Sequence, residues 1–384
     1  MQMEIYLDNA ATTRPREEVI EAVMNIYRSD YGNPSSLHRK GLEAEKKIKE
    51  ARKAVAQLIG AAENDIYFTS GGTESNNIAI QGIVNRYGKK NKHLITSAYE
   101  HHSVLNIFKH LENSGYEVTY LKPNPQGVIT VESLKSALRE DTVLVSIMMV
   151  NNELGSIQAI KEMSQIIQNH SSAKFHVDGV QAVGKMPVHV KHLGVDAFSL
   201  SGHKLHGTKG TGAIYLKNGL NITGIYKGSG QEGGIKPGTE NVPGIVALGK
   251  ATEILLEKME VENTQIKQMR DLLAKQLLSL LDQVVINTDL ENSAPHLLNV
   301  TFKGIRGEVF LHYLENDQIY VSTGAACSSK SKGSHVLRAI GLSNDDIEGT
   351  IRLSLSVLNT EAEIIEASEK MARTVNEIRK IMKR

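Results

Sequence analysis

The chain has 384 residues, of which 40% are hydrophobic and 23% are charged, a globular composition that excludes intrinsic disorder. Its 44 basic and 43 acidic side chains leave a formal charge of +1, which excludes nonspecific nucleic-acid or membrane binding through a strong positive field. One cysteine excludes an intrachain disulfide and a multi-cysteine zinc site. Because the sequence shows neither a signal-like start nor a membrane-length apolar run, we expect a cytoplasmic enzyme with one large and one smaller domain.

Two amphipathic helices are predicted first. Pro15 can occupy the first turn of a helix that runs to Tyr27, and Gly60 can close a second helix that carries Ile48 and Val55. Short β-rich runs then alternate with helical stretches, which is typical of a mostly parallel sheet covered by helices. The β-rich runs are 66–68, 94–96, 118–121, 142–150, 175–177, 197–200 and 213–216, with helical stretches near 73–87 and 102–114.

A smaller α+β unit is expected at the C-terminal side. A long helical pattern runs from about residue 243 past Leu277, followed by β-rich runs at 284–286 and 297–302 and a helix from about residue 360. The segment before Pro15 is short and could pack against either unit. We expect a large domain of residues 15–258 and a small domain of residues 1–14 with 259–384.

A lysine follows one of the predicted strands. Ser201-Gly202-His203-Lys204 comes directly after 197–200, and an isolated lysine in such a glycine-rich loop is most often a surface residue. A catalytic lysine needs a lowered amine pKa or a carbonyl cofactor that binds it as an imine, as pyridoxal phosphate does.

Two other segments suit such a cofactor. Asp178 ends the run 175–177, where a carboxylate can hold a protonated pyridinium nitrogen, and Gln181 can reach the same ligand. The strand, glycine turn and helix start at 68–75 can cradle a phosphate. Taken singly, Asp178 is more typical of a helix cap or a turn, and 68–75 is equally typical of an ordinary turn capped by Thr73.

Polar clusters follow two more strands. These are Glu100-His101-His102 and Asn151-Asn152-Glu153, and strand ends are where α/β proteins bind ligands. Neighbouring histidines on a helix diverge by about 100°, and no third ligand is spaced nearby, so we expect no metal site. We expect His101 to stack over an aromatic cofactor ring.

The last two candidates lie in the C-terminal part. Cys327 stands among Gly, Ala, Ser and Lys in a loop-like stretch, which favours a reactive thiol at least as much as a small buried hydrophobe. Arg352 lies in an alternating strand, where a half-buried guanidinium requires a carboxylate partner. A substrate carboxylate would satisfy it.

Taken together, the ordered motifs closely resemble the NifS/IscS-type cysteine desulfurases over essentially the whole chain. The segments that carry the resemblance are 6–13, 32–36, 68–76, 100–101, 150–153, 176–178, 201–204 and 322–327. The resemblance implies a fold-type I pyridoxal 5'-phosphate enzyme of the class-V aminotransferase family, with a mostly parallel seven-stranded sheet flanked by helices and a smaller α+β domain. It also implies a homodimer that converts L-cysteine to L-alanine and places the sulfur as a persulfide on its own cysteine. Acceptor proteins would take that sulfur for iron–sulfur cluster assembly, tRNA thiolation or thio-cofactor synthesis.

The resemblance also assigns roles. Lys204 carries the cofactor and moves protons, Asp178 holds the pyridinium nitrogen, and Gln181 holds the ring hydroxyl. Cys327 attacks the substrate sulfur. The remaining assignments are His101 for ring stacking, Gly72, Thr73, Ser201 and His203 for the phosphate, Thr239 for the phosphate across the dimer interface, and Asn152 with Arg352 for the substrate carboxylate.

The sequence departs from the family at two places. Gly233 and Lys236 stand where relatives carry arginines, and Ser356-Val357 stands where housekeeping relatives carry Gly-Arg. The spacing after Cys327 resembles the long-loop branch of the family. Three alternatives are a selenocysteine lyase, another fold-type I aminotransferase, and an inactive partner-binding protein; neither alternative enzyme would require Cys327.

Overall fold

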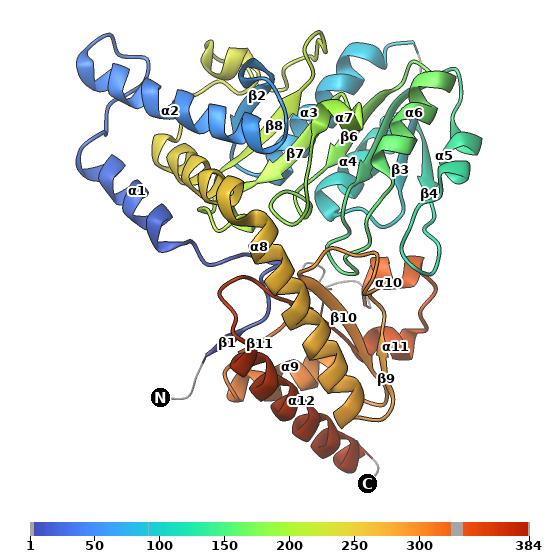
Figure 1. The fold of residues 1–384 in the computed structure, drawn as a ribbon. Coiled ribbons are helices and arrows are strands. Elements are labelled where there is room, and N and C mark those ends of the chain that lie inside the picture. Colours follow the sequence, from blue (N-terminus) through green and yellow to red (C-terminus); the bar gives the residue numbers. More distant parts are fainter. Residues whose placement is uncertain (1–3, 91, 324–332, 383–384) are drawn as a thin grey trace.

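The computed structural model in Figure 1 describes residues 4–90, 92–323 and 333–382. A large sheet with helices on both faces forms the upper part of the view, and smaller sheets with four helices form the lower part. Helix α8 (Val242–Leu280) runs from one part into the other.

The large sheet contains seven strands in the described part of the chain, in the order β2-β8-β7-β6-β5-β3-β4. Only β8 is antiparallel to its neighbours, so the predicted mostly parallel seven-stranded sheet is confirmed. The strands are β2 (Ile66–Thr69), β3 (His93–Ser97), β4 (Glu117–Leu121), β5 (Thr142–Met148), β6 (Lys174–Asp178), β7 (Ala197–Ser201) and β8 (Gly212–Leu216).

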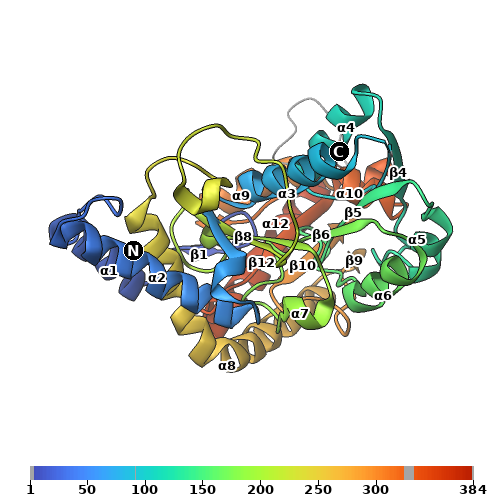
Figure 2. The same cartoon turned by 90° about the horizontal axis from the view of Figure 1, so that it is seen from above.

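Helices cover both faces of this sheet (Figure 2). The residues of β5 and β7 are buried throughout, as is expected of strands that helices cover on both faces. The helices are α1 (Glu17–Arg28), α2 (Arg39–Leu58), α3 (Gly72–Tyr87), α4 (His102–Asn113), α5 (Val131–Ala137), α6 (Ile160–His170) and α7 (Val190–Leu193), with 3-10 turns at Glu63–Asp65, Gly202–Lys204 and Gln231–Gly234.

The lower part is built on an antiparallel sheet in the order β12-β10-β9, beside a short parallel pair of β1 and β11. Its strands are β1 (Ile5–Tyr6), β9 (Val284–Ile286), β10 (Leu297–Phe302), β11 (Ile319–Tyr320) and β12 (Thr350–Ser354). Its helices are α9 (Gly307–Asn316), α10 (His335–Ala339), α11 (Asn344–Glu348) and α12 (Glu361–Met382).

The predicted boundary between two domains stays a prediction. Ile5 and Leu7 are buried in one apolar cluster with Phe302 and Phe310, which supports grouping the first residues with the C-terminal unit. In contrast, Val336 of α10 belongs to the apolar cluster of the large sheet.

The first helix begins later than expected. Pro15 lies before the helix, because Arg16, with extended backbone angles, precedes the first helical residue, Glu17. In the described part of the chain, every helix is either too short or too polar to span a bilayer.

Arg270 joins helix α8 to the loop before β10. Its guanidinium is fully buried and donates to Leu290 O at 2.6 Å, Ala294 O at 3.2 Å and Ser293 Oγ at 2.9 Å. Ala294 N in turn donates to Gly155 O at 2.9 Å, in the turn that follows β5. Arg270 therefore ties α8 to this loop, and the backbone of Ala294 ties the same loop to the turn after β5.

We expect Arg270→Ala to destabilise the protein by roughly 3–5 kcal/mol, because it leaves buried carbonyl oxygens without donors and opens a cavity. Thermal unfolding monitored by circular dichroism measures the effect. Arg373→Ala is the matched control: its ion pair with Asp317 is exposed, and we expect its loss to cost less than about 1 kcal/mol. Equal melting temperatures for the two variants would contradict this role of Arg270.

Candidate active site

A cavity of about 330 Å³ lies where β5, β6 and β7 end, beside the start of α3 and the strand β12. Carboxyl ends of parallel strands are the usual place for a ligand in this class of fold. The described residues that line it are Asp8, Ala10, Ala11, Gly72, Thr73, His101, His102, Ser103, Met148, Asn152, Glu153, Asp178, Val180, Gln181, Ser201, His203, Lys204, Ser322, Gly333, Ser334, His335 and Arg352.

Most of the site residues predicted from the sequence meet in this cavity. Thr239 is not among the described lining residues; it is exposed on the segment before α8. Cys327 lies outside the described residues. The predicted residues that line the cavity are Gly72, Thr73, His101, Asn152, Asp178, Gln181, Ser201, His203, Lys204 and Arg352.

Lys204 is positioned by a 3-10 turn (Gly202–Lys204) directly after β7. Its Nζ donates to Ala10 O at 2.5 Å and to Ala11 O at 2.7 Å. The first residues of the chain therefore contact an amine that comes from the middle of the sequence.

Asp178 is the last residue of β6 and is 5% exposed. Its Oδ2 accepts from Asn76 Nδ2 at 2.8 Å, and its Oδ1 accepts from Val180 N at 3.0 Å. These two donors fix the carboxylate in one orientation at the wall of the cavity.

The start of α3 forms an anion cradle. Gly71 has a φ of +146°, and a Cβ on Gly72 would lie 2.6 Å from Val180 Cγ2, so this turn requires glycine. The first-turn amides of a helix have no acceptor within the helix. Ser201 and His203 line the cavity beside them.

Two histidines border the same space. His101 caps α4, where its Nδ1 accepts from Ser103 N at 3.1 Å. Loss of solvent around the ring lowers the pKa of His101, although Asp178 opposes the shift. Burial, reinforced by Lys204 and Lys209, lowers the pKa of His203 to about 4, so its ring is neutral near pH 7 and can accept or donate a hydrogen bond.

These groups fit pyridoxal 5'-phosphate. The cradle at Gly72 suits the phosphate, the fixed Asp178 carboxylate suits a protonated ring nitrogen, and Lys204 supplies the amine that a carbonyl cofactor requires. The structure brings these three features to one cavity, although they come from three different strand ends.

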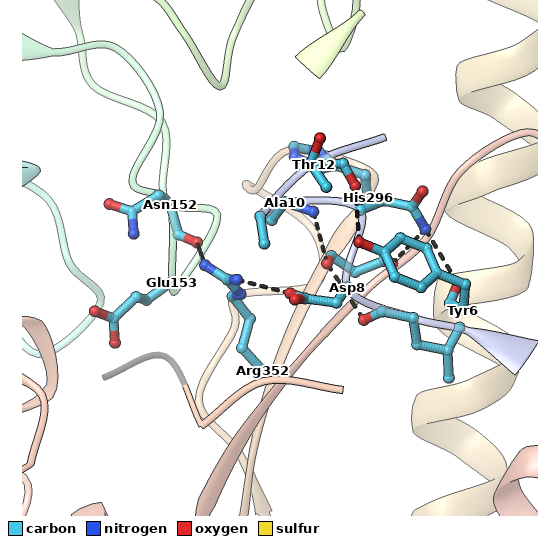
Figure 3. A network of polar contacts seen from close by, with 12 residues as sticks. Tyr6, Asp8, Ala10, Thr12, Asn152, Glu153, His296 and Arg352 are labelled. Atoms are coloured by element: carbon cyan, nitrogen blue, oxygen red, sulfur yellow. Dashed lines mark hydrogen bonds and ion pairs between the residues drawn. The ribbon is translucent and has the colours of Figure 1, made fainter. Parts of the chain in front are cut away.

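Arg352 forms the opposite wall (Figure 3). It lies on β12, is 6% exposed, and its Nη1 donates to Asn152 O at 3.0 Å. Its Nη2 pairs with Asp8 Oδ1 at 2.8 Å. Among the described residues, neither Arg352 Nε nor Asn152 Oδ1 has a hydrogen-bond partner, although both atoms are buried. Unpaired buried polar atoms at a cavity wall are suited to a polar ligand.

Sequence reasoning gave no role to four residues that shape the site. Asp8 pairs with Arg352, and Asn76 orients Asp178. Glu100 and Glu153 were identified only as parts of polar clusters after strands. The position of each cluster at the end of a strand indicated a place near the site. In contrast, nothing in the sequence around Asp8 or Asn76 indicates a partner 344 or 102 residues away.

Two buried acids adjoin the cavity. Burial raises the pKa of Glu100 to about 8 and that of Glu153 to about 7. Ser334 Oγ donates to Glu153 Oε2 at 2.6 Å, and Arg352 favours the charged form, but both effects are smaller than the effect of burial. Both carboxyl groups are therefore protonated to a large extent near neutral pH.

The raised pKa of Glu153 has a defined sign for stability. The folded protein retains a proton between the ordinary pKa of 4.5 and about 7 that the unfolded chain has released. Stability from this group is therefore present below pH 4.5 and is lost as the pH rises through about 7. Glu153→Gln can still accept from Ser334, and we expect it to raise the free energy of unfolding near pH 8.5 by at most on the order of 3 kcal/mol, and with it the melting temperature, but not near pH 5. Thermal unfolding at the two pH values checks this, with exposed Glu50→Gln as control; an equal shift at both pH values would contradict it.

Comparison with known proteins agrees with the fold. Residues 5–366 match the family described as "Aminotransferase class-V". The chain is 44% identical over 376 residues to the cysteine desulfurase IscS of Methanosarcina thermophila, covering 98% of this chain and 93% of the relative. It is 42% identical over 382 residues to the cysteine desulfurase IscS of Dictyoglomus turgidum, covering 99% and 97%.

Solved structures give the same relationship. A NifS-like protein superposes with a TM-score of 0.93 at 38% identity, covering 98% of this chain and all of that one. A structure described as SspA in complex with cysteine superposes with a TM-score of 0.82 at 33% identity, covering 93% of this chain and all of that one. The chain belongs to the cysteine desulfurases of the class-V aminotransferase family, which are enzymes dependent on pyridoxal 5'-phosphate.

Proposed function

We propose that this protein converts L-cysteine to L-alanine and transfers the sulfur atom to Cys327 as a persulfide. The observation that carries the proposal is that Lys204, Asp178 and Arg352 meet in one cavity. An amine, a fixed carboxylate and a guanidinium are the groups needed for a carbonyl cofactor and an amino-acid substrate.

The cofactor would be held at both ends. The amides at Gly72 and Thr73, with Ser201 and His203, bind its phosphate, and Asp178 faces its ring nitrogen. When bound, pyridoxal phosphate withdraws electrons from the α-carbon of an amino acid and so weakens the bonds to that carbon. Lys204 carries the cofactor and moves protons at its Nζ, Gln181 holds the ring hydroxyl, and His101 lies over the ring.

The substrate carboxylate would bind at Arg352 and Asn152. Arg352 and Asn152 line the cavity, and a guanidinium binds carboxylates through charge-assisted hydrogen bonds. This contact orients the α-carbon toward Lys204.

The sulfur step balances without an added oxidant. The thiolate of Cys327 forms a bond to the substrate sulfur while the carbon–sulfur bond breaks, and the carbon fragment takes up a proton to leave L-alanine. The persulfide then passes to acceptor proteins of iron–sulfur cluster assembly, tRNA thiolation or thio-cofactor synthesis, and the protein acts in the cytoplasm.

The first experiment incubates the holoenzyme with L-cysteine and a reductant and measures alanine and sulfide together. We expect equal amounts of the two products, and a loss of about 100-fold or more in Cys327→Ser, because a hydroxyl cannot accept sulfur. The absorbance of the bound cofactor shows that the variant is folded and loaded.

Two results would favour another enzyme. Alanine formation that depends on a keto acid and survives in Cys327→Ser would indicate an aminotransferase. Full activity of that variant on selenocysteine alone would indicate a selenocysteine lyase. A purified protein without cofactor absorbance would favour the inactive partner-binding alternative.

A homodimer is part of the proposal. Thr239 is exposed and lies away from the cavity of its own chain, which suits a residue that completes the site of a second copy. Large apolar side chains on α1, α2 and the segment between them are also exposed, where these helices project from the large unit (Figure 1). They are Ile20, Met24, Tyr27, Tyr31, Leu37 and Leu42.

We expect sedimentation equilibrium to give a dimer for the wild type. The double variant Tyr31→Glu and Leu37→Glu should weaken the dimer about tenfold or more, because it would bury charge in an apolar interface. Tyr313→Glu on α9 is the control, since that side chain is exposed on the other unit. A monomeric wild type that binds the cofactor would contradict the dimer.

A further inference from the structure

The guanidinium proposed to bind the substrate carboxylate already faces a carboxylate of the protein itself. Arg352 Nη2 lies 2.8 Å from Asp8 Oδ1, and only 7% of the Arg352 side chain is exposed. Figure 3 shows the guanidinium between Asp8 on one side and the backbone of Asn152 on the other. Charge-assisted pairs of this length are strong and directional.

The fold holds Asp8 in this place. Asp8 forms a parallel bridge with Ser354, two residues beyond Arg352 on β12. Asn9 N donates to Ser354 O at 3.2 Å, and Ala10 N donates to Ser354 Oγ at 2.8 Å. The backbone of Asp8 is therefore fixed beside Arg352.

Asp8 is also accessible from the cavity. Its side chain is 22% exposed and is part of the cavity wall. The same short segment continues to Ala10 and Ala11, whose carbonyl oxygens accept from Lys204 Nζ. A ligand that enters the cavity thus meets Asp8 between the two cationic groups.

The pair limits how a second carboxylate can bind. One N–H of Nη2 donates to Asp8 and one N–H of Nη1 donates to Asn152 O, so the two contacts fix the plane of the guanidinium and leave fewer N–H groups for a ligand. A substrate carboxylate would meet a guanidinium whose charge Asp8 has largely neutralised, and like charges this close repel each other. The affinity for the α-carboxylate should therefore be lower than an unpaired arginine would give.

A lower affinity for that group suits the proposed reaction. The α-carboxylate is the same in L-cysteine and L-alanine, so binding it more tightly would hold substrate and product equally and would not accelerate the chemistry. A neutralised arginine can still orient the ligand while it allows the product to leave.

We propose that Asp8 is a positioning residue that fixes the orientation of the Arg352 guanidinium and weakens the affinity of the site for the α-carboxylate. This inference rests on the proposed function, because it takes an amino acid as the ligand of Arg352. It predicts that removing the charge of Asp8 changes the affinity only for ligands that carry a carboxylate.

The test compares L-alanine with L-alaninamide, which lacks the carboxylate, by calorimetric titration of the holoenzyme. Asp8→Asn keeps an oxygen that can accept from Arg352 but removes the charge. We expect the dissociation constant of L-alanine to fall about threefold or more while that of L-alaninamide stays unchanged. The ratio of the L-alaninamide constant to the L-alanine constant should therefore rise. The control is Asp317→Asn, which breaks an ion pair with Arg373 on the far side of the small unit and should leave both constants unchanged.

Two results would overturn the inference. One is an unchanged ratio of the two constants; the other is an equal loss of affinity for both ligands, which would mean that Asp8 only supports the fold. If Asp8→Asn is not recovered folded, Asp8→Ser removes the same charge and must give the same change in ratio.

The role of Asp8 and the proposed function can be contradicted independently of each other. A protein that forms alanine and sulfide but shows no change of ratio in the Asp8 variant would contradict only the role of Asp8. A protein that shows the change of ratio but forms no persulfide would contradict only the proposed function.

Discussion

The candidate site depends on the pairing of the first residues of the chain with β12. Ser354 N donates to Leu7 O at 2.7 Å, and Ser354 Oγ accepts from Ala10 N at 2.8 Å. Ser354 is fully buried, and a buried polar group left unpaired costs roughly 1–3 kcal/mol. Because the paired segment also contacts Lys204, it sets the position of the amine relative to Arg352. This segment therefore joins the two walls of the cavity, together with the direct hydrogen bond from Arg352 to Asn152 O.

Burial determines which groups around the cavity carry charge. His176 lies between Ser146 Oγ at 2.8 Å and Ser199 Oγ at 3.0 Å, and burial lowers its pKa to about 3. Its ring therefore links three neighbouring strands as a neutral group. Burial likewise keeps Glu100 protonated near pH 7 beside Asp178. A neutral Glu100 avoids a second negative charge near Asp178, and the neutral His176 ring holds the strands together through hydrogen bonds.

The sequence predicted most of the fold because that information is local. Strands such as 175–177 and 197–200 showed β-rich runs, and their ends carried Asp178 and Lys204, which parallel topology brings to one edge. Contacts between distant segments could not be predicted in the same way. The pairing of Asp8 with Arg352 joins residues 344 positions apart, and no periodicity links them. Likewise, the raised pKa of Glu153 depends on how α10 packs over it.

The separation of the paired segments has a consequence for protein synthesis. The strands of the large sheet, from Ile66 to Leu216, leave the ribosome well before β12 does, and chains emerge at about 5–20 residues per second. For many seconds the nascent chain can form the Lys204 side of the cavity while the N-terminal segment still lacks its partner strand. The complete site is therefore a late product of translation, and the buried face of Ile5 and Leu7 requires shielding from other chains until the last strand arrives.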